Sequence, residues 1–296
     1  MSTLRWYGAG LLAMAVLLVA DLAGGPIGAD DIDYGISESM WNQLLGLELV
    51  TLFLVLPWTV AAAVLALRGH GSAPLLGFAP SAYTTYMYAQ YVLGPQYDSY
   101  QPVVLLEVAL TSGGLLLCLW SWSLARALPA PPTTPRRQRV LGLVLLGLAA
   151  FVLLRYLPGL VDTVGQSPIP TEFADAPTFY WSILLLDLGV VVPLTVAAAV
   201  AALRGTPAGV RAPYAVLGWF ALVPPSVFAM AVVMVANDDP NASVPTTVLL
   251  GVASLVFGVA AALVLRRLFG PGRATPADGT DDPARVPARG AESETS

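Results

Sequence analysis

The residues of this sequence that could do chemistry are a few ionisable and polar side chains set in otherwise apolar segments. Such residues either bind a charged solute or ion, or hold one another in a network of buried ion pairs. The candidates for one polar site inside a membrane are Asp21, Glu48, Tyr83, Tyr86, Gln90, Glu107, Arg155, Asp162 and Asp187.

Arg155, in FVLLRYLPGL, is the only basic residue outside the short basic loops and the C-terminal tail. A cation in hydrocarbon costs roughly 2.5 to 3.5 kcal/mol, so we expect Arg155 to be buried in a helix bundle and paired with an acid. The acids on the same half of the membrane are Asp21, Glu48, Glu107, Asp162 and Asp187. Two interpretations remain open: a water-accessible cavity that opens outward, or a dry ion-pair network that fixes how helices dock.

A segment rich in tyrosine, SAYTTYMYAQYVLGPQYDSYQP, is the least apolar of the long runs. Helical spacing places Tyr83, Tyr86 and Gln90 near one face, which predicts a helix that lines a polar cavity. Tyr97 and Tyr100 fit better in the aromatic belt at the membrane surface.

Motifs for other kinds of chemistry are missing from the sequence. No HExxH, CxxC, GxSxG or GxxxxGK[ST] pattern occurs, and the single cysteine, Cys118, excludes a disulfide framework. We therefore expect no catalytic, cofactor or metal site and no nucleic-acid partner.

The elements that must position these residues are membrane helices. The chain is 56% hydrophobic and only 11% charged, with a mean hydropathy of +0.72, whereas about a quarter of the residues in soluble domains are charged. Eight apolar runs are long enough to cross a bilayer. They are Trp6 to Ala23, Trp41 to Leu67, Pro74 to Leu93, Val103 to Ala125, Val140 to Leu160, Phe179 to Leu203, Tyr214 to Ala236 and Val244 to Leu268. The predicted fold is an all-α polytopic bundle.

An internal repeat organises these runs. LPWTVAAAVLALRG at 56–69 returns as VPLTVAAAVAALRG at 192–205, with 11 of 14 positions identical and a spacing of 136 residues. This aligns the second run with the sixth and predicts two parallel four-helix repeats, residues 1–129 and 140–269. A Pro/Arg-rich linker, 130–139, joins them, and we expect the tail 270–296 to be disordered.

The short loops alternate in charge. Basic residues occupy one set: Arg5, Arg68, Arg126, Arg136, Arg137, Arg139, Arg204, Arg211, Arg266 and Arg267. Acidic residues occupy the other: Asp30, Asp31, Asp33, Glu38, Asp98, Asp162, Glu172, Asp175, Asp238 and Asp239. The positive-inside rule then predicts that the basic loops and both termini are cytoplasmic.

Two segments resemble a family of multi-pass membrane proteins of unknown function that is common in actinobacteria and other bacteria. They are LGFAPSAYTTYMYAQYVLGPQYDSYQPVVLLEVAL and FYWSILLLDLGVVVPLTVAAAVAALRG. Family members often follow a Tyr-rich helix with a D-hGhhhPL segment, h being apolar, which Asp187, Gly189, Pro193 and Leu194 match. The resemblance implies a bacterial plasma-membrane protein and no particular activity.

Two functions fit the sequence. One is transport of a small solute or ion through an outward-facing polar cavity between the repeats, which the duplication and the polar third helix favour. The other is a non-catalytic scaffold or sensor that binds a protein partner or lipid. The lipid bilayer is the expected surrounding in both, and the sequence leaves the oligomeric state open.

Overall fold

The computed structural model describes residues 3–29, 34–97 and 100–269, and every regular element within these ranges is helical. The α-helices are α1 (Thr3–Gly24), α2 (Glu38–Val50), α3 (Leu56–Leu67), α4 (Ala73–Leu93), α5 (Pro102–Ala127), α6 (Pro135–Val164), α7 (Pro177–Leu186), α8 (Val192–Leu203), α9 (Pro207–Phe220), α10 (Val223–Ala236) and α11 (Val244–Leu265). Shorter turns are the π-helical η1 (Thr51–Val55) and η3 (Asp187–Val191) and the 3-10 turns η2 (Thr171–Phe173) and η4 (Arg266–Phe269).

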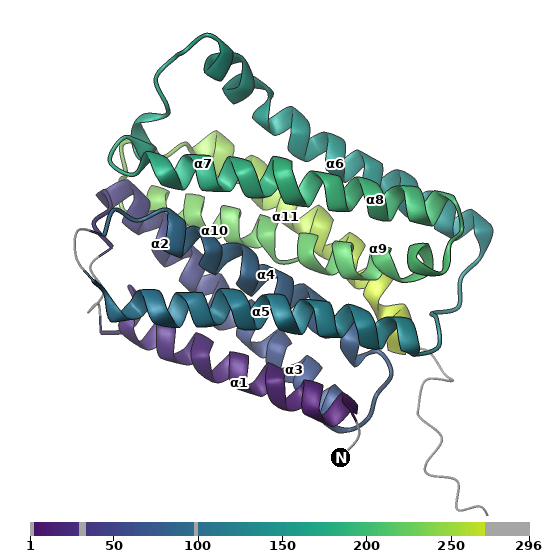
Figure 1. Ribbon diagram of the computed structural model, residues 1–296. Helices are drawn as coiled ribbons and strands as arrows, with labels where there is room; N and C mark the ends of the chain where they lie inside the picture. The colour runs from purple at the N-terminus through teal and green to yellow at the C-terminus, as the bar shows by residue number, and fades with distance from the viewer. Residues whose placement is uncertain (1–2, 30–33, 98–99, 270–296) are drawn as a thin grey trace, which may run out of the picture.

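These elements join into eight long segments that pack as one bundle (Figure 1), which confirms the predicted all-α membrane fold. Seven of the segments are long and apolar enough to cross a membrane. The exception is α4, which holds the predicted run Pro74 to Leu93. It has 21 residues, but its tyrosines, threonines and glutamine make it more polar. Packing against α3, α5, α7 and α9 surrounds α4 with protein, so its polar side chains find partners there.

A proline inside α4 shows how the bundle provides such partners. Pro80 has no N–H to donate to the carbonyl of Leu76, four residues earlier in the helix. The indole Nε1 of Trp58, on α3, donates to that carbonyl at 2.9 Å. Helix α4 therefore continues through Pro80 without a buried carbonyl left unpaired.

The repeated segment has the same local structure in both copies. A π-helical turn comes directly before each copy, Thr51–Val55 and Asp187–Val191, and the first residue of the copy donates its N–H to the carbonyl five residues earlier. A proline follows at once, Pro57 or Pro193. Since proline disfavours the regular i to i−4 bond, the wider turn accommodates it.

Each copy also ends alike, with an arginine at the helix end and then a glycine in the left-handed conformation. The φ angles are +75° at Gly69 and +66° at Gly205, a conformation that residues with a Cβ rarely adopt. The two copies therefore share a proline directly after a π turn and an Arg-Gly end with a left-handed glycine.

Helices far apart in the sequence hold the bundle together. Helix α1 packs on α3 and α6 on α8, while α2 packs on α10 and α4 on α9. The contact between α2 and α10 is closest at Gly46, where a Cβ atom would lie 2.5 Å from the backbone nitrogen of Met230. Small residues at such crossings let two helix backbones approach one another.

Two predicted boundaries differ from the structure. Helix α6 begins at Pro135, so half of the predicted linker is helical, and the hydroxyl of Thr134 accepts the N–H of Arg137 as an N-cap. Arg211, predicted in a loop, lies in α9 and is buried. Its guanidinium donates to the carbonyls of Ala125 and Leu128 at 2.7 and 2.8 Å. It thus satisfies carbonyls that the end of α5 leaves without helical partners.

The connections divide between the two ends of the bundle. At the left end in Figure 1 lie the links α6–α7 and α10–α11, which carry the acidic residues Glu172, Asp175, Asp238 and Asp239. The links α3–α4, α5–α6 and α8–α9 lie at the other end. Arg68 and Arg204 follow α3 and α8 there, and Arg126 and Arg136 lie in the adjoining ends of α5 and α6. The predicted loop acids Asp30, Asp31, Asp33 and Asp98 and the predicted disordered tail 270–296 lie outside the described residues.

Candidate functional site

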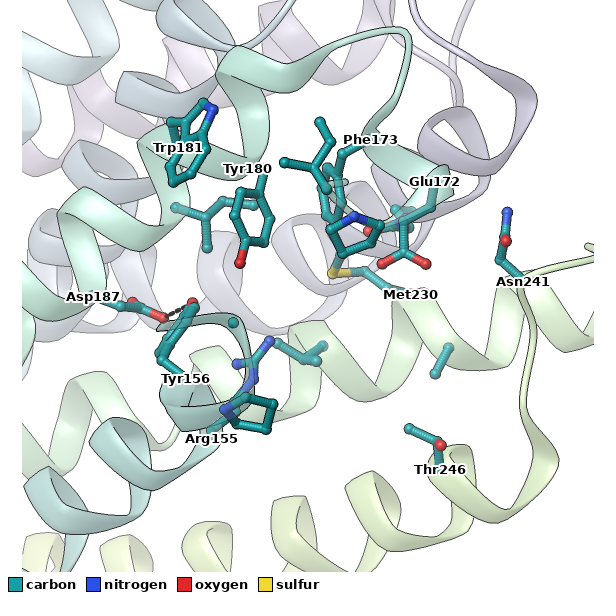
Figure 2. A pocket seen from close by; sticks show the side chains of 18 of the residues that line it. Arg155, Tyr156, Glu172, Phe173, Tyr180, Trp181, Asp187, Met230, Asn241 and Thr246 are labelled. Atoms are coloured by element: carbon teal, nitrogen blue, oxygen red, sulfur yellow. Dashed lines mark hydrogen bonds between the residues drawn. The ribbon is translucent and has the colours of Figure 1, made fainter. Parts of the chain in front are cut away.

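A pocket of about 840 Å³ opens at the acidic end of the bundle. Its walls come from the last turns of α6, the link between α6 and α7, α7, one face of α10 along its length and the start of α11, with residues of α2 and α4 as well. Figure 2 shows these side chains around the opening. Pockets of roughly 300 to 1,000 Å³ are the size that binds small molecules.

Asp187 marks the inner end of this pocket. It is the first residue of the π turn η3, is 6% exposed, and accepts hydrogen bonds from two tyrosines. The hydroxyl of Tyr86 donates to Oδ1 at 2.7 Å and that of Tyr156 to Oδ2 at 2.6 Å. Two donors, one on each oxygen, are the arrangement that suits a charged carboxylate.

Arg155 lines the middle of the pocket, and its position corrects our expectation. We predicted a buried arginine paired with an acid, whereas the side chain is exposed and its guanidinium lies 5.5 Å from the ring centre of Tyr156. Among the described residues no carboxylate lies within 4.0 Å of it. The reason is the pocket itself: Figure 2 shows Arg155 turned into that open space, so the cation needs no buried partner.

Asp162 lies seven residues after Arg155 and also lines the pocket. Helix α6 continues through Pro158 to Val164, so Asp162 and Arg155 share one helical face as the spacing predicts. Gln90 and Tyr86 on α4 line the pocket as well. Tyr83, which we placed on the same face, is instead fully buried, with its hydroxyl 2.8 Å from Oγ of Ser226.

The other three predicted acids form a separate, closed group. Asp21, Glu48 and Glu107 are at most 2% exposed and do not line the pocket. Asp21 accepts from the hydroxyl of Tyr88 at 2.6 Å, and Glu48 accepts from the backbone N–H of Ile27 at 2.9 Å. The structure therefore divides the single predicted site into an open pocket and a buried acid group.

The sequence interpretation missed several pocket residues. Tyr156, Tyr180, Trp181 and Glu172 belong to the pocket, but each follows or interrupts an apolar run and looks like a membrane-belt or loop residue. Tyr156 was the one that its place in the sequence could have revealed, since it follows directly after Arg155.

A polar network lies at the rim of the pocket. The carboxylate of Asp239 accepts from Nδ2 of Asn42 at 2.9 Å, from Oγ of Ser39 at 3.2 Å and from the backbone N–H of Asn241 at 2.8 Å. Burial works to raise the pKa of Asp239, but these donors together outweigh it and hold the pKa below its ordinary value. Burial, and then the charge of Asp239, raise the pKa of Glu172 nearby.

The side chains that line the pocket carry both signs of charge. Within the described ranges no group of three or more His, Cys, Asp or Glu side chains is arranged to hold a metal ion. The arrangement offers one cation, three acids and several aromatic rings around an opening, which suits reversible binding of a charged small molecule. No protein-family model, no curated protein and no solved structure matches the chain, so the resemblance to a bacterial membrane-protein family stays an expectation.

Proposed function

We propose that this multi-pass membrane protein binds a small solute in the pocket around Arg155 and Asp187 and carries it across the bilayer. The observation that carries the proposal is the depth of the pocket. Asp187 is ten residues into its 27-residue helical segment, so it lies about 15 Å below that end of the bundle. A polar pocket that reaches this far into the apolar layer is typical of a solute site.

The topology that we propose has eight spans, with α4 as the third, in a bacterial plasma membrane. Both termini and the arginine-rich end face the cytoplasm, which makes the pocket open outward. Reporter fusions test this: a fusion after Arg137 should report the cytoplasm and one within residues 30–38 the outside. A reversed pair of readings would overturn the orientation.

We further propose that residues 1–129 and 140–269 are two repeats of four helices. The matching π turns and the equivalent packing of α1 on α3 and of α6 on α8 support this proposal. Transporters often place the substrate site where two such repeats meet. Here the pocket contains residues from α2 and α4 as well as from α6, α7, α10 and α11.

Binding without transport is a second candidate, which would make the protein a sensor or scaffold. One observation favours it: Tyr86, which lines the pocket, and Trp219 of α9 stack edge to face, with ring centres 5.5 Å apart. Trp219 is 8% exposed. Transport would require this contact to open.

A ligand-stabilisation screen of the purified protein tests the binding step. Asp187→Asn removes the charge at the inner end of the pocket, and Glu48→Gln is the matched control because it changes a buried acid outside the pocket. A solute that raises the melting temperature of the wild type and of Glu48→Gln, but not of Asp187→Asn, supports the site. The absence of any stabilising solute across broad panels of metabolites and ions contradicts it.

Uptake of that solute into liposomes then separates the two candidates. Protein-dependent uptake that Asp187→Asn abolishes supports transport. Binding without uptake in the same vesicles supports the sensor or scaffold.

A further inference from the structure

The charges in the pocket are unevenly placed. Among the described residues that line the pocket, Arg155 is the one basic residue and the acids are Asp162, Glu172 and Asp187. Figure 2 shows Arg155 between Asp187 and Tyr156 on one side and Glu172 on the other. The pocket therefore surrounds a single cation with acids.

Asp187 and Arg155 differ in how many hydrogen bonds they already make. Both oxygens of Asp187 accept from tyrosine hydroxyls. The guanidinium of Arg155 lies 5.5 Å from the ring centre of Tyr156 and lines the pocket, and within the described part of the chain it makes no hydrogen bond that would use its five N–H donors. Arg155 is thus ready to bind an oxyanion with paired hydrogen bonds.

A simple anion would fit poorly in spite of this. Bound to Arg155, it would lie near three carboxylates, whose repulsion offsets the attraction of one guanidinium. A simple cation would be attracted by the three acids but repelled by Arg155. A molecule that carries both charges avoids both repulsions, because its ammonium group can face the acids and the aromatic rings while its oxyanion contacts Arg155.

The side of the pocket that α10 forms adds an apolar requirement. Val223, Val227, Met230 and Met234 of α10 line the pocket at spacings of four, three and four residues, which is one face of a helix. Methionine side chains adapt to irregular apolar groups. The pocket is therefore polar along α6 and apolar along α10.

We propose that the ligand is an amphipathic zwitterion, with a carboxylate or phosphate on Arg155, an ammonium group toward Asp162 and Glu172, and an apolar substituent against α10. This inference rests on the proposed function and names the chemical class of its solute. Two sources supply this chemistry: an apolar amino acid, and the headgroup region of a lipid such as lysophosphatidylethanolamine.

Three probes of matched shape and one lipid test the charge requirement on the unaltered, purified protein by thermal shift and calorimetry. They are L-phenylalanine, phenethylamine, which lacks the carboxylate, 3-phenylpropionate, which lacks the ammonium group, and lysophosphatidylethanolamine. We expect binding of L-phenylalanine or of the lipid, and about ten- to a hundredfold weaker binding of the two probes that carry one charge. Binding of the amino acid identifies a free solute, and binding of the lipid alone identifies a lipid headgroup.

Variants at Arg155 test where the oxyanion binds. Arg155→Gln should weaken the zwitterion about ten- to a hundredfold, while Arg155→Lys, which keeps the charge, should recover part of the loss. Arg137→Gln is the matched control, since Arg137 also stacks on a tyrosine, Tyr214 at 5.8 Å, but at the other end of the bundle. If Arg155→Gln does not fold, the probe comparison on the unaltered protein decides.

The outcomes separate this inference from the proposed function. If one of the probes with a single charge binds as tightly as the zwitterion and Asp187→Asn abolishes that binding, the ligand class is wrong and the solute site stands. Zwitterion binding that Arg155→Gln leaves unchanged also overturns the inference. If neither these probes nor the broad panels bind, the proposed function itself fails.

Discussion

Replacing Asp239 by asparagine should weaken the join between the start of α2 and the link between α10 and α11. Oδ1 of Asp239 accepts from Ser39 and from the backbone of Asn241, and Oδ2 accepts from Asn42. Asparagine has nearly the same shape but replaces one acceptor oxygen by a donor. If the new amide nitrogen faces Asn42, two donors oppose each other.

Asn42 cannot relieve this conflict by turning its amide over. Its Oδ1 accepts from Nδ2 of Asn237 at 2.6 Å, so a reversed amide would place two donors together at that contact instead. A hydrogen bond to a charged group contributes about 1.5 to 3 kcal/mol. Because the network lies at the end of the bundle, beside solvent, we take the lower part of that range. We expect Asp239→Asn to lower the free energy of unfolding by about 2 kcal/mol. That corresponds to a decrease of about 4 to 8 °C in melting temperature.

Thermal unfolding in detergent measures this effect, with Asp238→Asn as the control. Asp238 is exposed, and the substitution changes the net charge by the same amount. Its φ of +52° is one that asparagine tolerates. We expect Asp238→Asn to melt within about 1 °C of the wild type.

The pH dependence provides a second test. The folded-state pKa of Asp239 is below its ordinary value, so its stabilisation is present above the ordinary pKa and is lost as the pH falls through the lowered pKa. Wild type and Asp239→Asn should therefore differ at pH 7 and converge toward pH 3. Equal melting of the two Asn variants at pH 7, or a difference that does not shrink on acidification, would refute the reasoning.

Three further substitutions test the packing by the same melting assay. Gly46→Leu should separate α2 from α10 and destabilise the protein by about 3 kcal/mol or more. The control Gly258→Leu, at a position with open space, should have little effect. Equal losses of stability in the two variants would contradict the close crossing of α2 and α10. Arg211→Gln should cost about 2 to 3 kcal/mol because the carbonyls at the end of α5 lose a charged donor, and the exposed Arg204→Gln is its control. Trp58→Phe should cost about 1 to 2 kcal/mol, since a buried carbonyl in α4 loses its donor, and an unchanged melt would show that α4 needs no such donor.

Hydropathy and length predicted all eight long segments, because lipid requires about twenty apolar residues in a row regardless of the neighbours, and seven of the eight are long and apolar enough to cross a membrane. Helix α4 shows the limit of that rule. A helix surrounded by other helices does not need to be apolar, so composition cannot show whether it spans. Its polar residues identified it as unusual, but only the packing shows that Tyr83 turns to Ser226 while Tyr86 turns to the pocket.

The candidate site was predictable in its residue types and not in its grouping. Nothing in the sequence shows that Asp187 takes its hydrogen bonds from tyrosines on two other helices, Tyr86 and Tyr156, rather than from Arg155. Charge attraction suggested an ion pair. Two neutral donors satisfy the carboxylate instead, which leaves the arginine for the pocket.

The contacts between α2 and α10 also determine when this protein can finish folding in the cell. Asn42 and Asp239 are 197 residues apart in the chain. At about 5 to 20 residues per second, a ribosome needs roughly 10 to 40 seconds to make that length. For that interval Ser39 and Asn42 lack Asp239, and the surface around Gly46 lacks Met230. The newly made helix α2 therefore lies in the bilayer with its α10 contact surface uncovered. Temporary partners such as insertion factors can cover that surface, and membrane proteases can recognise it if synthesis stops early.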